Sequence, residues 1–159
     1  MAVYAYAFPL DRLIQALKFD ERLLLADFLA AALQPDAGQL PDALIPMPLH
    51  SARLRERGHN QSLELARALS RRLGIPVWME AAQRLRDTPP QASLPWKARQ
   101  KNLRGAFACA PHVAGKRIAI VDDVMTTGAS LNELARALKR AGATEVEAWV
   151  VARTLPHSR

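Results

Sequence analysis

The sequence predicts an α/β protein in which a mostly parallel central sheet is flanked by helices. The clearest strand pattern spans residues 117–121, and its continuous apolar part at 118–121 is typical of a strand that is covered on both faces. A helical pattern follows from residue 131 to about residue 140, and a second strand pattern spans residues 146–151. A strand, a helix and a strand at this spacing favour a right-handed crossover between parallel strands. The 159 residues, half of them hydrophobic, suit one domain (1–159) with a packed core.

The N-terminal part of the chain predicts two consecutive helices within residues 10–33. Apolar side chains recur there at helical spacing, beginning with Leu10, Leu13, Ile14 and Leu17. Phe19 and Asp20 interrupt the run, and Asp20 is a suitable N-cap for a second helix. In that second helix, Leu24, Phe28 and Leu29 are expected to face the core.

The middle of the chain predicts a strand, a helix and a second strand. The strand at residues 43–45 is short and buried, and Pro46 and Pro48 bar regular pairing directly after it. Residues 60–73 are expected to form a helix that Gly74 ends. Residues 75–79 read as the next strand, with Pro76 favouring an edge or a strand start. The leucines expected to face inward from the helix are Leu65, Leu69 and Leu73.

Residues 84–105, which we call the basic segment, differ from the rest of the chain. They carry six basic residues against one acid, Asp87, and three prolines interrupt them. A loop of this length in a compact domain is usually functional or disordered. The basic residues are Arg84, Arg86, Lys97, Arg99, Lys101 and Arg104.

The net charge of +7 and the pI near 10.3 favour anionic partners such as phosphate esters, nucleotides or nucleic acid, without choosing among them. A generally basic surface is the alternative.

The single cysteine, Cys109, can form no internal disulfide, and its apolar neighbours favour a buried thiol over a nucleophile. No apolar run approaches the ~20 residues of a membrane span. With no secretion signal at its N-terminus, the chain is expected to be cytoplasmic and not inserted in a membrane.

Residues 126–130, which we call the phosphate loop, stand between the clearest strand and the helix after it. Ser130 and Glu133 match a capping box, which predicts a helix start near residue 131. Backbone N–H groups at a helix start are unpaired, the helix dipole adds positive potential, and Gly128 admits a backbone conformation closed to side chains. The segment is therefore a candidate phosphate cradle. Its residues are Thr126, Thr127, Gly128, Ala129 and Ser130.

Asp122 and Asp123 come where the strand is expected to end, at the edge where open α/β sheets bind ligands. Two acids facing a phosphate would repel it, whereas vicinal hydroxyls can donate hydrogen bonds to them. A ribose 5-phosphate satisfies both parts, with its phosphate in the phosphate loop and its 2′- and 3′-hydroxyls on the acids. Direct binding of Mg²⁺ by the acids and a pure turn-and-cap role for the loop are the alternatives. The Lys-Ser/Thr pair of a P-loop and a GxGxxG fingerprint are both missing.

Residues 121–130 resemble the motif with which type I phosphoribosyltransferases bind 5-phosphoribosyl-1-pyrophosphate (PRPP). Residues 17–19, 45–49, 57–61 and 99–107 resemble the ComF family, which is competence-protein-F-like, in the same order along the chain. The resemblance implies a type I phosphoribosyltransferase-like fold that binds PRPP, and a mobile hood formed by the basic segment. It also implies a pyrophosphate loop at residues 47–50, in which His50 is either a ligand contact or an ordinary loop residue. The pyrophosphate loop comprises Met47, Pro48, Leu49 and His50.

The resemblance implies Mg²⁺ held mainly by PRPP, so no metal ligands are expected from the protein itself. Many family members begin with a cysteine-rich zinc module that this sequence lacks, so zinc is not expected. Whether that module was lost or lies upstream of residue 1 stays open. Thr126 stands where 6-oxopurine salvage enzymes carry an acid near the nucleobase. Since a threonine is no general base at neutral pH, salvage of that kind is disfavoured.

Further candidate residues lie outside these two loops. Arg99 and Lys101 are candidate catalytic residues that would contact pyrophosphate, and solvation of a loop is the alternative for both. The resemblance adds Lys18, Arg57 and Asn60 as candidate site residues. An N-cap is an equally sound role for Asn60.

Two functions from different classes follow. As an enzyme, the chain would transfer the phosphoribosyl group of PRPP to an unidentified nitrogen acceptor and release pyrophosphate. As a non-catalytic module that binds PRPP or a nucleotide, it would serve DNA uptake in natural transformation, in contact with single-stranded DNA or a helicase, as the family resemblance implies. A homodimer is an open alternative to a monomer.

Overall fold

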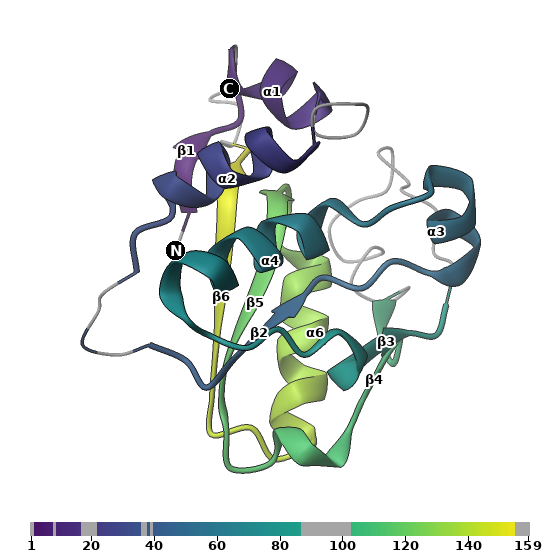
Figure 1. Ribbon diagram of the computed structural model, residues 1–159. Coiled ribbons are helices and arrows are strands. Elements are labelled where there is room, and N and C mark those ends of the chain that lie inside the picture. Colours follow the sequence, from purple (N-terminus) through teal and green to yellow (C-terminus); the bar gives the residue numbers. More distant parts are fainter. Residues whose placement is uncertain are drawn as a thin grey trace, which may run out of the picture.

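The computed structural model describes residues 2–7, 9–16, 22–35, 38, 40–86 and 103–154 (Figure 1). Its strands are β1 (Ala2–Ala5), β2 (Ala43–Pro46), β3 (Ala82–Arg84), β4 (Phe107–Cys109), β5 (Arg117–Met125) and β6 (Glu145–Arg153). Its helices are α1 (Leu10–Ala16), α2 (Arg22–Ala32), α3 (Ser51–Arg57), α4 (Gln61–Leu73) and α6 (Ala129–Arg140), with short 3-10 helices η2 (Met79–Ala81) and η3 (Pro111–Val113). The candidate residues Lys18, Arg99 and Lys101 and the expected cap Asp20 lie outside the described residues.

Four strands form one parallel sheet in the order β1-β6-β5-β2. β5 is central, since it pairs with β2 as far as Val121 and with β6 as far as Met125. The connection from β5 through α6 to β6 is the crossover that the sequence predicts. The fold class, an α/β protein with a parallel sheet flanked by helices, is confirmed.

β5 supplies two hydrophobic cores, one on each face of the sheet. Ala119 and Val121 belong to the core that includes α2 and α4, whereas Ile118 and Ile120 belong to the core that includes α6. In Figure 1, α2 and α4 lie in front of the sheet and α6 lies behind it. Burying each large apolar side chain contributes about 1.5–3 kcal/mol, so these two cores are a main source of the stability of the sheet and its helices. Fully buried leucines of the helices include Leu29, Leu65, Leu69, Leu134 and Leu138.

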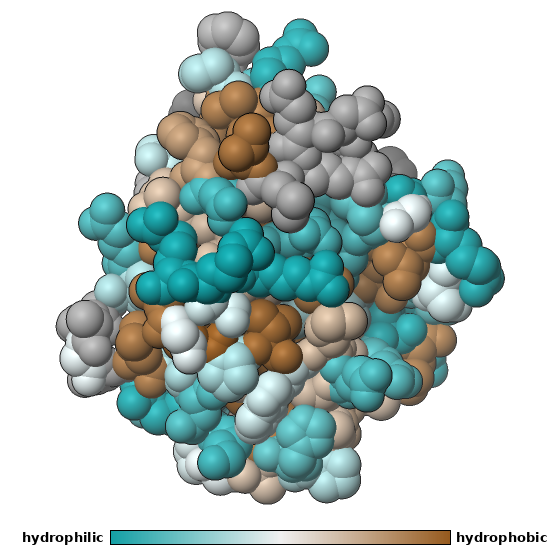
Figure 2. Space-filling model, in the orientation of Figure 1, coloured by the Kyte–Doolittle hydropathy of each residue, from teal (hydrophilic) through white to brown (hydrophobic). Residues whose placement is uncertain are grey.

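Helix α2 presents a different face to the core than the sequence predicts. Leu29 is fully buried as expected, but Leu24 and Phe28 are 78% and 63% exposed. The buried face instead contains Ala26, Leu29 and Ala30, and the small side chains of the two alanines allow close packing on α4. Because the helix is apolar nearly all round, hydrophobic spacing alone does not select a face. Figure 2 shows hydrophobic side chains gathered over α2, above a hydrophilic band over α4.

Several boundaries also differ from the sequence prediction. The predicted strand at residues 75–79 is reduced to one parallel bridge between Val77 and Leu44. The antiparallel pair of β3 and β4, the first strand β1 and the helix α3 were not predicted. These elements are only three to seven residues long. Elements this short have too few positions to show a hydrophobic period, so their pairing depends on tertiary contacts.

Cys109 lies half-buried in β4, and burial raises the pKa of its thiol, against an opposing effect of the Arg140 charge. A raised thiol pKa leaves little reactive thiolate, in line with a structural thiol.

Among the described helices, none has both the length and the apolar composition that a membrane span requires.

Candidate functional site

The two acids lie side by side on β5, just beyond the point where β2 stops pairing with it. β2 ends at Pro46 opposite Val121, while β6 accompanies β5 through Met125. The strand therefore does not end before the acids, as the sequence suggested, because β6 continues to pair with it. The result is an open edge on the β2 side of Asp122 and Asp123, at the carboxyl end of the sheet, where ligands bind in open α/β folds.

Each acid accepts hydrogen bonds that fix its carboxylate. Asp122 Oδ1 accepts from the Asp123 backbone N–H at 3.0 Å and from Ser62 Oγ at 2.9 Å. Asp123 Oδ1 accepts from the Val124 backbone N–H at 2.7 Å. Ser62, in the first turn of α4, was not among the predicted site residues, and the sequence carries no signal that pairs it with a residue sixty positions away.

The pKa of Asp122 is raised well above its ordinary value. Burial is the main cause, and the neighbouring Asp123 charge adds to it, while hydrogen bonds from Ser62 and the Asp123 backbone oppose the shift. The charged carboxylate of Asp122 is therefore poorly solvated, and additional hydrogen-bond donors would stabilise it. Neutral hydroxyls of a ligand would supply such donors, whereas an anionic group would raise the energy of the site.

The phosphate loop begins where β5 ends and gives α6 an uncapped N-terminus. Gly128 has a φ of +73°, a left-handed conformation that disfavours other residues, and no side chain within the described chain caps the helix there. The backbone carbonyl of Thr126 accepts from Thr154 Oγ1 at 3.1 Å, which holds the start of the loop against the end of β6. Thr126 and Thr127 are exposed, and Ala129 is buried. The first-turn N–H groups of α6 are therefore left for a ligand.

The predicted capping box is wrong. Helix α6 begins at Ala129, which puts Ser130 inside the first turn, and Ser130 makes no cap. Glu133 instead accepts a hydrogen bond from the Gly105 backbone N–H at 2.9 Å. The pattern of a serine followed three residues later by a glutamate was right for a helix start but wrong about partners, because a tertiary contact claims the glutamate.

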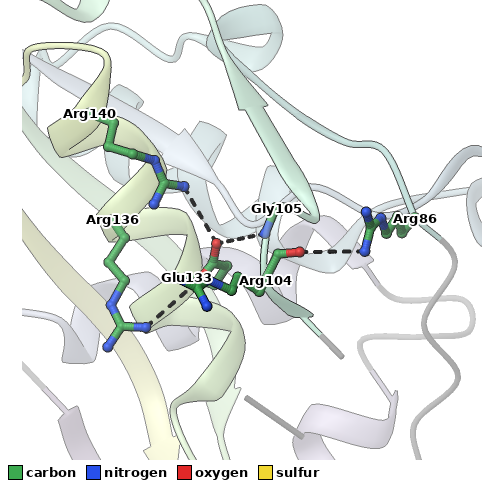
Figure 3. Close-up of polar contacts among 6 residues, drawn as sticks. All are labelled: Arg86, Arg104, Gly105, Glu133, Arg136 and Arg140. Carbon is green, nitrogen blue, oxygen red and sulfur yellow. Dashed lines mark hydrogen bonds and ion pairs between the residues drawn. The ribbon is translucent and has the colours of Figure 1, made fainter. Parts of the chain in front are cut away.

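Glu133 joins helix α6 to the end of the basic segment, as Figure 3 shows. It is 4% exposed and also meets Arg140 at 3.5 Å and Arg136 at 3.8 Å. Nearby, Arg86 Nη1 donates to the Arg104 carbonyl at 3.5 Å. The two ends of the basic segment are thereby held together beside the helix that begins with the phosphate loop. Of the basic segment's residues, 87–102 lie outside the described ones.

The predicted pyrophosphate loop lies next to the acids. The Met47 backbone N–H donates to the Val121 carbonyl at 2.9 Å, one residue before Asp122, and Met47 is buried. The other residues of this loop, Pro48, Leu49 and His50, are half-buried. His50 caps α3 by accepting from the Ala52 backbone N–H at 3.4 Å. The structure therefore brings the pyrophosphate loop and the acids together.

The side chain of Asn60 makes two hydrogen bonds, one to the start of α4 and one to the pyrophosphate loop. Its Oδ1 accepts from the Ser62 backbone N–H at 3.0 Å, so the expected N-cap of α4 is confirmed. Its Nδ2 also donates to the Met47 carbonyl at 3.0 Å, which holds the pyrophosphate loop. Arg57 ends α3 with an exposed side chain, and within the described residues no contact joins it to either acid.

Two hollows lie near these elements. A groove of about 670 Å³ runs between the pyrophosphate loop, the start of α4 and β3, and His59, Asn60 and Arg84 line it. A shallower hollow of about 540 Å³ lies on the outer face of α6 and is strongly basic through Arg136, Lys139 and Arg140. No group of three potential metal-binding side chains occurs in the part of the chain that the structure describes.

Known proteins resemble this chain over most of its length. Residues 59–157 match the model of a family described as phosphoribosyl transferase domain. Competence protein F of Haemophilus influenzae is 38% identical over 93% of this chain and 69% of that protein. DNA utilization protein YhgH of Escherichia coli K12 is 39% identical over 98% of this chain and 72% of that protein.

Solved structures share the fold, for example that of an amidotransferase. Glutamine PRPP amidotransferase from B. subtilis, complexed with ADP and GMP, superposes with a TM-score of 0.53 at 22% identity. The superposition covers 81% of this chain and 25% of that one. At this identity the likeness concerns the fold alone.

Proposed function

Because this chain belongs to the phosphoribosyl transferase domain family, with competence protein F and YhgH as relatives over nearly its full length, we propose that it binds PRPP at the carboxyl end of β5. One observation carries the proposal: a pair of acids and an uncapped helix N-terminus stand at the two ends of one short segment, residues 122–130. The carboxylates accept hydrogen bonds from hydroxyl groups, and the N–H groups at the helix start bind an anion. A ribose 5-phosphate has both groups on one small molecule.

Each part of the site has a role in this proposal. The ribose hydroxyls donate to Asp122 and Asp123, and the 5-phosphate accepts from the N–H groups of residues 126–130. The pyrophosphate lies against residues 47–50, where Asn60 fixes the backbone. Mg²⁺ would neutralise charge on the pyrophosphate. It would be held mainly by PRPP itself, so no cage of protein ligands would be needed.

We further propose that the bound PRPP reacts with a nitrogen acceptor. The nitrogen lone pair forms a bond to ribose C1 as the bond from C1 to the pyrophosphate oxygen breaks, and that bond's electron pair leaves with pyrophosphate. The acceptor loses a proton to water or to a group still to be identified. This chain's residues would act mainly by orienting PRPP and by stabilising the leaving charge. Arg99 and Lys101 of the basic segment are our candidates for that stabilisation, with the segment closing over the site as a hood.

The threonine at position 126 restricts the range of suitable acceptors. Its side chain is exposed, and a hydroxyl cannot take a proton from a purine at neutral pH as a carboxylate can. We therefore propose an acceptor whose attacking nitrogen has a free lone pair at neutral pH without help from a protein base.

The alternative is a non-catalytic accessory protein that binds PRPP and contacts single-stranded DNA or a DNA-translocating helicase. The basic outer face of α6 favours it, since Arg136 and Arg140 are each 60% or more exposed there. The names of the relatives, a competence protein and a DNA utilization protein, agree with such a role. A second copy of this chain is a further candidate partner. The cytoplasm is the compartment we propose for either function.

Calorimetry with PRPP and Mg²⁺ tests the binding proposal. The double variant Asp122→Asn/Asp123→Asn should lose PRPP binding, because an amide accepts hydroxyl donors less strongly than a carboxylate. The double variant Glu80→Gln/Glu147→Gln changes the charge equally at two exposed positions and should bind normally. Unchanged affinity of the Asp122→Asn/Asp123→Asn variant would contradict the proposal.

Pyrophosphate release separates the two functions. The enzyme should release pyrophosphate from PRPP with at least one member of a panel of amines and bases, whereas the accessory protein should bind PRPP without release. For the accessory function, Arg136→Glu/Lys139→Glu should abolish retardation of single-stranded DNA in a gel. Arg55→Glu/Arg72→Glu, on α3 and α4, should leave the retardation intact.

A further inference from the structure

The start of α4 contains polar atoms that the fold leaves without partners. In the described residues, the buried side-chain nitrogen and oxygen atoms that lack a hydrogen-bond partner are His59 Nε2 and Gln61 Nε2. Nearly all buried polar groups in native proteins are hydrogen-bonded, so each exception calls for an explanation. These two flank the same residue, Asn60. The side chain of Gln61 is the more fully buried of the two, so its amide most needs an explanation.

Of the two side chains, Gln61 is the more deeply enclosed. It is 4% exposed and is the first residue of α4. Its amide has two N–H donors, and burying them without an acceptor lowers stability. An apolar side chain would fill the same space without that cost. His59 is only half-buried, lines the groove and has a contact from Nδ1 to the Arg57 carbonyl at 3.0 Å.

The neighbours of Gln61 place it between two parts of the site. On one side, Asn60 Nδ2 donates to the Met47 carbonyl in the pyrophosphate loop at 3.0 Å. On the other side, Ser62 Oγ donates to Asp122 Oδ1 at 2.9 Å. Successive Cα atoms lie about 3.8 Å apart, so the Gln61 backbone is within a few ångströms of both contacts.

We propose that the start of α4 is a third wall of the PRPP site, in which the Gln61 side chain donates a hydrogen bond to an oxygen of the bound ligand. The inference rests on the PRPP binding proposed above. Asn60 and Ser62 are positioning residues in this arrangement, because they hold the pyrophosphate loop and Asp122 at the distance that the ligand spans. The acceptor is a pyrophosphate or ribose oxygen, both of which suit an amide donor.

The variant Gln61→Leu tests the inference, because leucine fills a similar volume and donates nothing. We expect the affinity for PRPP with Mg²⁺ to fall about tenfold to hundredfold, as for loss of a hydrogen bond to a charged group. We expect the unfolding temperature to stay the same or to rise, since a buried unpaired amide is removed. Gln15→Leu makes the same change on the exposed face of α1 and should alter neither quantity.

A second variant keeps the test decisive if Gln61→Leu folds poorly. Gln61→Glu retains size and polarity but places a negative charge beside an anionic ligand, so it should also weaken PRPP binding by at least tenfold. Titrations with magnesium pyrophosphate and with ribose 5-phosphate then identify the acceptor, since only the ligand that carries it should bind the variants more weakly.

The outcomes separate this inference from the proposal on which it rests. If the unsubstituted protein fails to bind PRPP, the proposed function and this inference both fall. If it binds PRPP and both Gln61 variants bind equally well, Gln61 is a packing residue and this inference alone is overturned. Weaker binding by the variants, with a normal unfolding temperature, supports it.

Discussion

The variant Gly128→Ala should affect ligand binding much more strongly than it affects the stability of the fold. The φ of +73° at Gly128 lies in the left-handed region, which costs an L-residue about 1–2 kcal/mol, and restricting the unfolded chain returns about 0.4–1 kcal/mol. A Cβ added there would lie 3.5 Å from Met125 Sδ, which is an ordinary contact. Gly128→Ala should therefore lower the free energy of unfolding only through the strain of the left-handed backbone conformation. A loss of about 1 kcal/mol lowers the unfolding temperature of a chain this size by about 2–4 °C.

The effect of Gly128→Ala on PRPP should be much larger than its effect on the fold. In the proposed binding mode, the methyl group would occupy space that the 5-phosphate needs in order to approach the first N–H groups of α6. Losing one hydrogen bond to a charged group corresponds to about 1.5–3 kcal/mol, or at least a tenfold loss of affinity in calorimetry.

Gly74 is the matched control. It has a φ of +71° at the end of α4, with nothing within 4 Å of an added Cβ. Gly74→Ala should therefore lower the unfolding temperature to the same extent and leave PRPP affinity unchanged. Equal affinities of the two variants would refute the assignment of residues 126–130 as the phosphate cradle.

Three further predictions concern stability. Because the folded-state pKa of Asp122 is raised, its charged form destabilises the fold above that pKa, so Asp122→Asn should unfold at a higher temperature than the unsubstituted protein at pH 8. This difference should shrink as the pH falls through the raised pKa toward about 4, the ordinary value for an aspartate, and a constant difference from pH 8 to pH 4 would contradict it. Glu133→Ala should destabilise the protein by about 1–3 kcal/mol in urea and speed hydrogen exchange at the Gly105 amide, which loses its acceptor; unchanged exchange would rule out this contact in solution. Leu29→Ala should cost about 2–5 kcal/mol in urea unfolding and Leu24→Ala less than about 0.5 kcal/mol, and equal costs would mean that Leu24 is buried in solution.

The sequence predicted the elements whose pattern is long and locally coherent. The central strand, the crossover helix and the turn between them were predicted because a buried strand, turn residues and a helix follow each other within about twenty-five residues. The Gly74 cap was found because a glycine after a helical run has one common use. The N-cap role of Asn60 was an open alternative that the structure confirms.

The rest depends on contacts between distant residues. Ser62 meets Asp122 only because α4 packs across β5, and Glu133 meets Gly105 only because β4 returns beside α6. The face of α2 that packs inward is chosen by the shape of α4, against which small alanines fit better than Phe28. Local pattern holds no information about such choices.

The pairing of β3 with β4 has a consequence for how relatives of this protein can diverge. The Leu85 backbone N–H donates to the Ala106 carbonyl at 2.8 Å, so the intervening stretch leaves and rejoins the fold at neighbouring points. Doubling the length of a loop closed in this way costs only about 0.6 kcal/mol of chain entropy. Changes in the length of the chain between residues 86 and 103 are therefore expected to leave the fold of β5 and the phosphate loop unchanged. Such tolerance would let relatives of this protein keep the parallel sheet and the phosphate loop while this stretch varies in length.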